Sequence, residues 1–337
     1  MNGFAFDVIG VGALNLDHRI SGLTTATLAA LLGRPIEWGT ETPVDAATVE
    51  TVLRRFPARA TPGGSAYNAI ATVAAEAPGL RLGYVGVGGR TFDHFDGVDH
   101  RHVLRADAAL SGTCIAYTES GERTLLTHAG ANTLMAEHLR QSFEPIVSYL
   151  ASARFVHVTS FLDPRTPPRL AELLRAVRAR GTGTRISFDP GHTWATTGPP
   201  VLGTIRAAAD YLFVNEVEFR ALGARRHDGA TIVLKRPDGI RMYGPDGFRH
   251  MAQTPLPEDA IRDATGAGDA FAGGFLAALS SAPEETPATG SAQDSAAVRG
   301  LAAARRRLLA AGPDTAPERP PGSRIVRPRG PRPGGHQ

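Results

Sequence analysis

The stretch Asp263–Leu279 reads DATGAGDAFAGGFLAAL and is the most informative segment of the sequence. Gly266 and Gly268 allow tight backbone conformations that turn successive N–H groups in one direction. The run of small and apolar residues that follows predicts a helix beginning near Asp269, and the N-terminus of a helix carries the positive end of its dipole. Gly266, Ala267 and Gly268 therefore predict an anion site, suited to a phosphate whose charge grows during transfer.

Asp269 stands at the mouth of this predicted anion site. A carboxylate there would repel a phosphate, so its presence calls for a task other than binding the phosphate. We interpret Asp269 as a general base toward an incoming hydroxyl group. The alternative is an ordinary N-capping aspartate after a glycine loop. The dense spacing D-x-T-G-A-G-D favours the functional interpretation.

Strand-like runs alternate with helical segments through most of the chain. This alternation predicts an α/β fold with a central, mostly parallel sheet flanked by helices. Almost continuous apolar runs, such as 154–159, fit strands that are buried on both faces. The predicted strands are 6–11, 82–87, 113–118, 123–127, 154–159, 184–188, 211–214 and 231–234, and the predicted helices are 65–77, 134–150, 168–180, 200–209, 270–279 and 296–311.

Two regions break the alternation. Residues 18–62 contain helical patterns at 24–32 and 45–56 but no convincing buried strand, so we predict a small inserted lid. Residues 313–337 are rich in Pro, Gly and Arg and hold almost no large apolar side chains, so we predict a disordered tail. The rest of residues 1–312 is predicted to form one domain.

Composition and charge exclude several classes of function. The chain has 337 residues and is long enough to bury a full core without disulfides or a structural metal. The chain has a single cysteine, Cys114, so an intramolecular disulfide and a Cys-based zinc finger are excluded. A single cysteine is also compatible with a reducing cytoplasm. We expect Cys114 to be a small residue of the core. The formal net charge of +3 resides in the predicted tail, which has five Arg against one Asp and one Glu, so no basic face indicates nucleic acid. No apolar run could span a bilayer, and no signal peptide is evident, so we expect a cytoplasmic protein without a membrane partner.

Two further motifs suit recognition of a sugar. The motif GVGALNLD ends at Asp17 and follows the first predicted strand. Sugar hydroxyls need fixed acceptors, and a carboxylate such as Asp17 holds two hydroxyls strongly. In TPGGSAYNAI, the pair Gly63–Gly64 opens a predicted helix, and Asn68 falls one turn inside it.

In this order the motifs resemble those of the phosphofructokinase-B (PfkB), or ribokinase-like, family of carbohydrate kinases, over roughly residues 6–311. The resemblance implies a ribokinase-like α/β fold and ATP-dependent phosphorylation of a primary alcohol. It implies that Asp269 is the catalytic base and that the amides of Gly266, Ala267 and Gly268 form the anion hole. It also implies that the acceptor is bound by Asn15, Asp17, Gly63, Gly64 and Asn68.

The nucleotide side is assigned from the same resemblance. NEVE, residues 215–218, resembles the family's Asn-x-x-Glu motif, in which Asn215 and Glu218 organise Mg²⁺ and phosphates largely through water. An ordinary helix start is the alternative. Asp263 and Thr265 are placed on the same side, and Lys235 points either at the ATP phosphates or to the surface of its strand. The implied ligands are ATP and Mg²⁺, and a monovalent cation is left open.

The acceptor is harder to predict. The long helical lid resembles the adenosine-kinase branch, which favours a nucleoside, while a free sugar or sugar phosphate is the runner-up. No cluster of basic residues is evident near Asn68, which speaks against a sugar phosphate. Trp38 either stacks on a base or pins the lid. A shortened region at 88–103 and an altered turn at 235–239 keep a non-catalytic, ligand-binding regulator as an alternative. The small-molecule acceptor and ATP are the expected partners of a monomer or homodimer.

Overall fold

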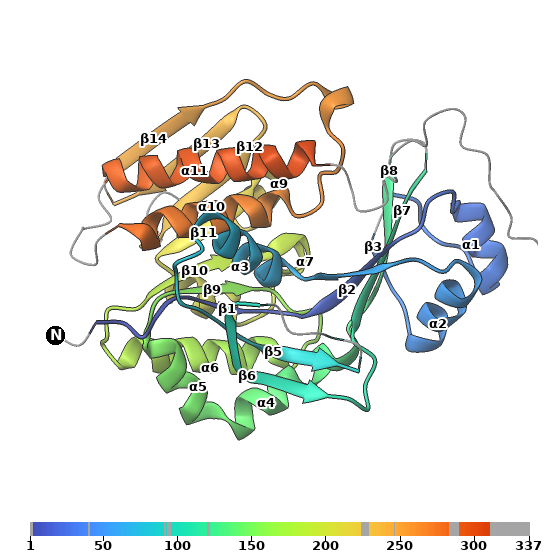
Figure 1. The fold of residues 1–337 in the computed structure, drawn as a ribbon, viewed down its shortest axis with the longest axis horizontal. Coiled ribbons are helices and arrows are strands. Elements are labelled where there is room, and N and C mark those ends of the chain that lie inside the picture. Colours follow the sequence, from blue (N-terminus) through green and yellow to red (C-terminus); the bar gives the residue numbers. More distant parts are fainter. Residues whose placement is uncertain are drawn as a thin grey trace, which may run out of the picture.

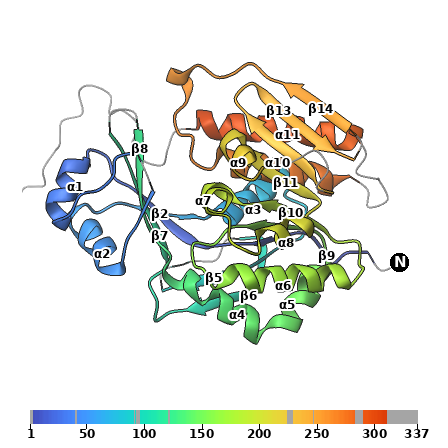
Figure 2. The same cartoon turned by 180° about the vertical axis from the view of Figure 1, so that it is seen from behind.

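The computed structural model describes residues 3–39, 41–90, 92, 96–119, 122–223, 229–245, 247–282 and 290–310. Its strands form two sheets of nine and five strands, here called the main sheet and the small sheet (Figures 1 and 2). The predicted disordered tail, residues 313–337, lies outside the described residues.

The main sheet is the predicted, mostly parallel core. Its strands run parallel from β6 to β12, and β13 and β14 continue it as an antiparallel edge. The order across the sheet is β14 (Gly247–Ala252), β13 (Gly239–Gly244), β12 (Thr231–Arg236), β11 (Tyr211–Asn215), β10 (Arg185–Asp189), β9 (Ala153–Thr159), β1 (Phe6–Val11), β5 (Leu82–Gly89) and β6 (Val98–Ala106).

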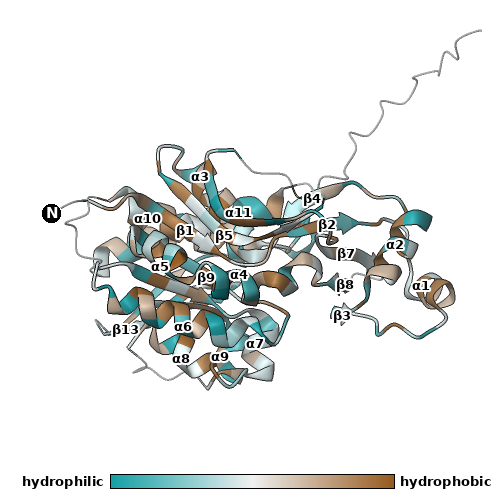
Figure 3. Ribbon diagram, turned by 90° about the horizontal axis from the view of Figure 1, so that it is seen from below, coloured by the Kyte–Doolittle hydropathy of each residue, from teal (hydrophilic) through white to brown (hydrophobic). Residues whose placement is uncertain are grey.

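Helices cover both faces of the main sheet because its strands are apolar on both. Tyr211 and Phe213 of β11 join one hydrophobic cluster, and Leu212 and Val214 join the other. Figure 3 shows β1, β5 and β9 between the two helical layers. One layer holds α3 (Ser65–Glu76), α10 (Ala267–Ser281) and α11 (Gly290–Leu309). The other holds α4 (Met135–Gln141), α5 (Phe143–Ala151), α6 (Thr166–Ala179), α7 (Gly191–Thr197), α8 (Leu202–Ala207) and α9 (Glu216–Ala221), while short turns η1 (Gly130–Leu134) and η2 (Glu258–Ala260) lie in connections.

The helix predicted at 134–150 is two helices. Ser142 lies between α4 and α5 with φ −112° and ψ 28°, outside the helical region, so the helix is interrupted there. Both helices bury apolar side chains in the same cluster, among them Leu139 and Ile146. Two short helices therefore satisfy an apolar pattern that also fits one long helix.

The small sheet forms the core of a second unit at one end of the molecule (Figure 1). Its order is β3 (Glu41–Pro43), β8 (Glu122–His128), β7 (Gly112–Glu119), β2 (Asn15–Arg19) and β4 (Ala60–Gly63). Helices α1 (Thr25–Leu32) and α2 (Ala46–Arg55) pack on this sheet through a separate hydrophobic cluster that includes Leu28, Val52 and Tyr117. We call the sheet with these two helices the small unit.

Two expectations about this region are corrected. Residues 18–62 hold strand residues as well as the two predicted helices, and the predicted strands 113–118 and 123–127 lie in the small sheet and not in the main one. The reason is physical. A short strand covered on one face alternates buried and half-exposed residues, as β2 does, and shows no continuous apolar run.

Candidate functional site

The structure has a tight turn at the start of α10, where the sequence predicts an anion site. Gly266 has φ +73°, a left-handed conformation that suits glycine, and α10 begins at Ala267, two residues before the expected position. Asp263 Oδ1 accepts a hydrogen bond from the backbone N–H of Thr265 at 2.9 Å and shapes the turn. The first amides of α10 therefore face a common space at the positive end of the helix dipole.

Asp269 lies in the first turn of α10. Asn68 Nδ2, from α3, donates to Asp269 Oδ2 at 2.9 Å, so the structure brings together two predicted site residues that are 201 positions apart. Burial raises the pKa of Asp269 to about 6, against the hydrogen bond from Asn68, which favours the charged form. A carboxylate with a raised pKa is a stronger base than an ordinary aspartate and is still ionised near neutral pH.

Glycines bring the backbone close to Asp17. The strands β2 and β4 pair antiparallel, with Asn15 opposite Gly63. A Cβ on Gly63 would lie 2.2 Å from Asp17 Oδ2, so only glycine leaves room for this carboxylate. Gly64 has φ +107°, and a Cβ there would lie 2.2 Å from the carbonyl oxygen of Ala13. The glycine pair is therefore required by geometry, as the motif suggests.

Asn132 is a site residue that the sequence analysis missed. Its Nδ2 donates to Asn15 Oδ1 at 2.9 Å and its Oδ1 accepts from the backbone N–H of Leu14 at 2.9 Å, so it fixes the strand that carries Asn15. It comes from η1, far along the chain. No motif marks an asparagine whose partners are 117 and 118 positions away.

Two cavities meet at Asp269. The acceptor cavity, of about 330 Å³, is lined by Asn15, Asp17, Gly64 and Asn68 among others. The nucleotide cavity, of about 560 Å³, is lined by Asn215, Glu218, Lys235 and apolar residues of α10 and α11. Ser65, Gly191, Gly266, Gly268 and Asp269 line both. Cys114, which we expected in the core, is half-buried and lines the acceptor cavity.

Lys235 points into the nucleotide cavity and not to the surface. Its Nζ donates to Asp189 Oδ2 at 2.7 Å, and a Cβ on Gly268 would lie 3.1 Å from that same nitrogen. Burial alone would lower the pKa of Lys235, but the negative charges of Asp189 and Glu218 raise it above its ordinary value. A permanent positive charge therefore lies beside the amides of α10.

The NEVE motif is a capping box. Asn215 Oδ1 accepts from the backbone N–H of Glu218 at 2.9 Å, and Glu218 Oε2 accepts from the backbone N–H of Asn215 at 2.8 Å. The alternative interpretation, an ordinary helix start, therefore describes the local structure of the motif. Both residues also line the nucleotide cavity. Burial raises the pKa of Glu218, and the charge of Asp189 adds to the effect.

The oxygen donors present suit magnesium held mainly through water and phosphate. Glu218 and Asp189 carry hard carboxylate oxygens on the wall of the nucleotide cavity, and Mg²⁺ binds in proteins through one or two such groups while keeping several waters. Within the described part of the chain, no group of three or more His, Cys, Asp or Glu could hold a metal ion by itself.

Asp263 is engaged by arginines. Arg19 of β2 forms an ion pair with Asp263 Oδ2, and Arg307 of α11 donates to the same oxygen at 2.9 Å. Burial alone would raise the pKa of Asp263, but the hydrogen bonds from Thr265 and the pairing with Arg19 hold it at about 2. Both arginines also line a cavity that contains Asp17 and Asn68, so the sequence-based expectation that no basic cluster lies near Asn68 is wrong.

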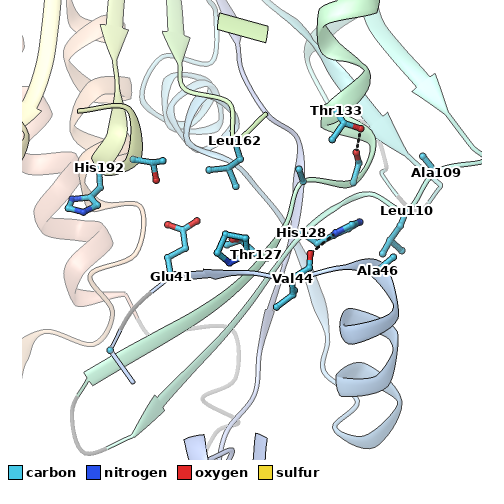
Figure 4. Close-up of a pocket in the computed structure, with 15 residues that line it drawn as sticks. Glu41, Val44, Ala46, Ala109, Leu110, Thr127, His128, Thr133, Leu162 and His192 are labelled. Carbon is cyan, nitrogen blue, oxygen red and sulfur yellow. Dashed lines mark hydrogen bonds between the residues drawn. The ribbon is translucent and has the colours of Figure 1, made fainter. Parts of the chain in front are cut away.

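A larger cavity adjoins the acceptor cavity at the edge of the small sheet (Figure 4). It has a volume of about 950 Å³ and shares seven lining residues with the acceptor cavity, among them Glu41, His128, Leu162 and His192. Glu41 and His192 point into it, and His128 Nδ1 lies 3.0 Å from the carbonyl oxygen of Val44 (Figure 4). The shared residues are Glu41, Thr127, His128, Ala129, Leu162, His192 and Thr193.

Trp38 does not line this cavity. Its side chain is 48% exposed, and its Nε1 donates to the carbonyl oxygen of Glu119 in β7 at 3.3 Å. Of the two interpretations of Trp38, the geometry favours the one in which it pins the small unit. Among the described residues, no helix is long and apolar enough to cross a membrane.

The chain resembles known proteins both in sequence and in fold. The family model described as pfkB family carbohydrate kinase matches residues 42–315. The chain is similar to the ATP-dependent ribose-1-phosphate kinase of Halopiger xanaduensis, with 32% identity over 239 residues that cover 65% of this chain and 73% of that protein. It is also similar to the aminoimidazole riboside kinase of Salmonella typhimurium, with 30% identity over 200 residues that cover 53% of this chain and only 60% of that relative.

Among solved structures, adenosine kinase from Schistosoma mansoni in complex with 2-fluoroadenosine superposes with a TM-score of 0.72. The match covers 90% of this chain and 96% of that chain at 14% identity. At this level of identity the likeness concerns the fold, which is shared over nearly the whole of both chains.

Proposed function

Because the chain belongs to the pfkB family of carbohydrate kinases, we propose that it transfers the γ-phosphoryl group of ATP to the primary hydroxyl of a ribofuranosyl compound, with a nucleoside as the first candidate acceptor. The family assignment makes it a phosphotransferase that acts on an alcohol group, and its ribokinase-like α/β fold is confirmed. The acceptor and the roles of individual residues are proposals.

One observation carries the proposal. Asp269 and the N-terminal turn of α10 lie where the acceptor cavity and the nucleotide cavity meet. A hydroxyl group bound by Asp17 and Asn68 and a phosphate bound beside Lys235 would both face this carboxylate. Placing the two reactants in one oriented arrangement is the largest task of a phosphotransferase, because the transfer needs little covalent chemistry from the protein.

The step we propose uses each of these groups once. The acceptor hydroxyl oxygen attacks the γ-phosphorus, the bond from that phosphorus to the β–γ bridging oxygen breaks, and ADP leaves. The hydroxyl proton passes to Asp269. The amides of Gly266, Ala267 and Gly268 hold the negative charge on the transferred group. Lys235 and the turn that follows Asp263 and Thr265 support the phosphates of the nucleotide.

Magnesium, when bound, neutralises phosphate charge. Glu218, with Asn215 fixing its backbone, and Asp189 are the residues that we expect to hold it, mainly through water. A monovalent cation stays a prediction, as does the choice between a monomer and a homodimer.

The cavity beside the acceptor site favours a nucleoside over free ribose. Its volume of about 950 Å³ and its mixture of apolar walls with Glu41 and His192 suit a planar, polar-edged base. A free sugar would leave this space to water. The names of the relatives, which include an aminoimidazole riboside kinase and an adenosine kinase, support a ribofuranosyl compound as the acceptor.

The regulatory alternative is disfavoured by the intact chemistry. A relative that only binds a ligand has no need for a buried aspartate with a raised pKa next to a complete Gly-Ala-Gly turn. The altered turn at 235–239 still leaves Lys235 on the nucleotide cavity. The region 88–103 contributes to strands β5 and β6 where it is described, and its remaining residues lie outside the described part of the chain.

A direct test is an ADP-release assay with the purified full chain, ATP and Mg²⁺ over a panel of nucleosides, ribose and other pentoses. We expect at least one nucleoside to be phosphorylated with a higher kcat/KM than ribose. Good turnover of ribose with no turnover of any nucleoside would reject the nucleoside and leave a sugar kinase. No ATP-dependent turnover of any acceptor would favour the regulatory alternative.

A further inference from the structure

The acceptor cavity extends in two directions along the small sheet. The larger extension, described above, lies at the β3–β8 edge. A second extension of about 290 Å³ lies mainly against β7, β2 and β4, toward the opposite edge. Each shares residues with the acceptor cavity, but the residues that line the two extensions have no member in common. The acceptor cavity therefore has room on two sides.

The smaller extension has a cationic wall. Arg19 and Arg307 line it, and both bind the single carboxylate of Asp263. Because the carboxylate of Asp17 lines this extension as well, the wall can attract an anion through the N–H donors of the two arginines and not through an excess of charge. Each guanidinium carries five N–H donors in a planar fork that matches phosphate oxygens. Thr61 and Thr265 add hydroxyl groups to the same wall.

The cationic wall lies at the distance of one sugar ring from the proposed hydroxyl-binding residue. Asp17 and Arg19 are two positions apart on β2 and so share a face, with Cα atoms about 7 Å apart. Arg307 lies close to the anion site as well, since a Cβ on Gly266 would meet Arg307 Nε at 3.6 Å and Asp269 Oδ2 at 3.7 Å. An acceptor whose hydroxyls lie on Asp17 would place a further substituent within reach of both arginines.

The stereochemistry of ribose relates the two extensions to the two anomers of a substituted ribose. Nucleosides carry the base on the β face of the anomeric carbon, whereas an α-anomer directs its substituent to the opposite face of the ring. One ribose pose, with its 5-hydroxyl at Asp269, would therefore send a β substituent and an α substituent to different sides of the cavity. The larger extension suits the planar base, and the cationic extension suits a charged group.

We propose that Arg19 and Arg307 bind a phosphate group on the anomeric carbon of the acceptor, so that α-D-ribofuranosyl phosphates are substrates beside nucleosides. This inference rests on the proposed kinase activity. The 5-hydroxyl oxygen of the acceptor attacks the γ-phosphorus of ATP, the bond to the bridging oxygen of ADP breaks, and the proton passes to Asp269. The anomeric phosphate stays intact, and the product carries a phosphate at each end.

The test compares acceptors in matched variants. We would measure kcat/KM of the full chain with α-D-ribose 1-phosphate, ribose and the best nucleoside of the panel, in wild type, Arg19→Gln and Arg307→Gln. Hydrogen bonds to charged groups suggest a loss of roughly tenfold or more for ribose 1-phosphate in each variant, and a much smaller loss for the nucleoside. Arg306→Gln is the matched control, because Arg306 is the neighbour of Arg307 on α11 and pairs with Glu76 outside these cavities.

Asp263→Asn should change the preference between the two acceptors in the opposite direction. The asparagine still accepts the hydrogen bond from the Thr265 amide but frees both guanidinium groups from a charged partner. We expect the preference for ribose 1-phosphate over the nucleoside to rise. If Arg19 and Arg307 acted only by holding the turn at Asp263, this variant would lower the activity on all acceptors in the same proportion.

Two results would overturn the inference. One is an equal loss on ribose 1-phosphate and on the nucleoside in Arg19→Gln and Arg307→Gln. The other is turnover of nucleosides by the wild type with none of ribose 1-phosphate, which leaves the proposed kinase activity standing. If no acceptor is turned over, calorimetric titration of ribose 1-phosphate into wild type and Arg307→Gln decides the binding site by itself. Equal or absent binding then rejects it.

Discussion

Asp269 is subject to two opposing effects, and their balance sets its chemistry. Burial disfavours its charged form, while the hydrogen bond from Asn68 Nδ2 favours it, and the pKa settles at about 6. A lower value would make the carboxylate a weak base, and a much higher one would leave it protonated in the cell. Asn68 thus lines the acceptor cavity and also holds the carboxylate of Asp269.

Replacement of the base should separate chemistry from binding. Asp269→Asn keeps the shape and a partner for Asn68 but cannot take a proton, so we expect kcat to fall by about 10²–10⁴-fold, in line with general-base contributions. Acceptor affinity measured by calorimetry should change little. Asp259→Asn, an exposed aspartate near the same turn, is the control. A variant that keeps more than roughly a tenth of the wild-type kcat contradicts the role.

The raised pKa of Asp269 predicts that the kinase activity depends on pH. The base acts when deprotonated, and its raised pKa means that it gains a proton as the pH falls through about 6. We expect kcat/KM to be level above this pH and to fall about tenfold per pH unit below it. Circular dichroism over the same range shows whether the fold persists. A profile that stays flat to about pH 4.5, near the ordinary range of Asp, would show that Asp269 is not the titrating base.

Single residues also show where sequence reasoning stops. Asp269, Asp17 and the glycines could be assigned because each belongs to a short motif, and the structure brings these motifs together. Arg19 could not, because it meets Asp263 across 244 positions and arginine is common throughout this chain. Trp38 attracted attention by its residue type alone, and its ring lies outside the cavities described.

At the scale of elements, the pairing of β2 with β4 is the feature that positions Asp17 beside the backbone of Gly63. β2 follows β1 of the main sheet closely and carries Asp17, while β4 leads directly into α3, which carries Asn68. Register therefore decides the distance between the carboxylate and the backbone at Gly63. The sequence predicted both main-sheet neighbours of this pair, β1 and α3, nearly to the residue, since each has a long apolar pattern.

A methyl group at Gly63 should therefore disturb acceptor binding. In Gly63→Ala the new Cβ would lie 2.2 Å from Asp17 Oδ2, so the carboxylate must move. We expect KM for the acceptor to rise more than kcat falls, because the base and the nucleotide cavity are untouched. Gly79→Ala is the matched control, since its Cβ would meet no atom within 4 Å. Equal kinetics of the two variants would show that Asp17 does not bind the acceptor.

The strands of the small sheet were the least predictable elements. Those at 15–19, 41–43 and 60–63 are short and covered on one face, so their patterns resemble loops. The strands at 112–119 and 122–128 were recognised as strands, but a pattern of alternation does not say which sheet a strand joins. Sheet membership follows from pairing between distant segments, which local sequence does not record.

At the scale of the molecule, the two units have separate cores. Two hydrophobic clusters cover the faces of the main sheet, and a third lies inside the small unit around Leu28. Arg19 of the small unit and Asp263 of the main body form an ion pair beside the acceptor cavity. We propose that the small unit acts as a lid, which would exclude water that competes for the γ-phosphate.

Matched core substitutions should tell whether the small unit opens independently. Leu28 and Leu170 are both fully buried, the first in the small unit and the second on α6 under the main sheet. Leu170→Ala should lower the free energy of global unfolding by about 2–5 kcal/mol, as buried leucine truncations do. Leu28→Ala should instead reduce hydrogen-exchange protection in α1 and α2 while α6 keeps its own, because a separate core can loosen alone. The KM of Leu28→Ala for the acceptor should rise with a modest change in kcat. A loosened lid would bind the acceptor less well but leave Asp269 in place. If Leu28→Ala lowers protection equally in α1, α2 and α6, the two units unfold as one, and a lid that moves on its own is rejected.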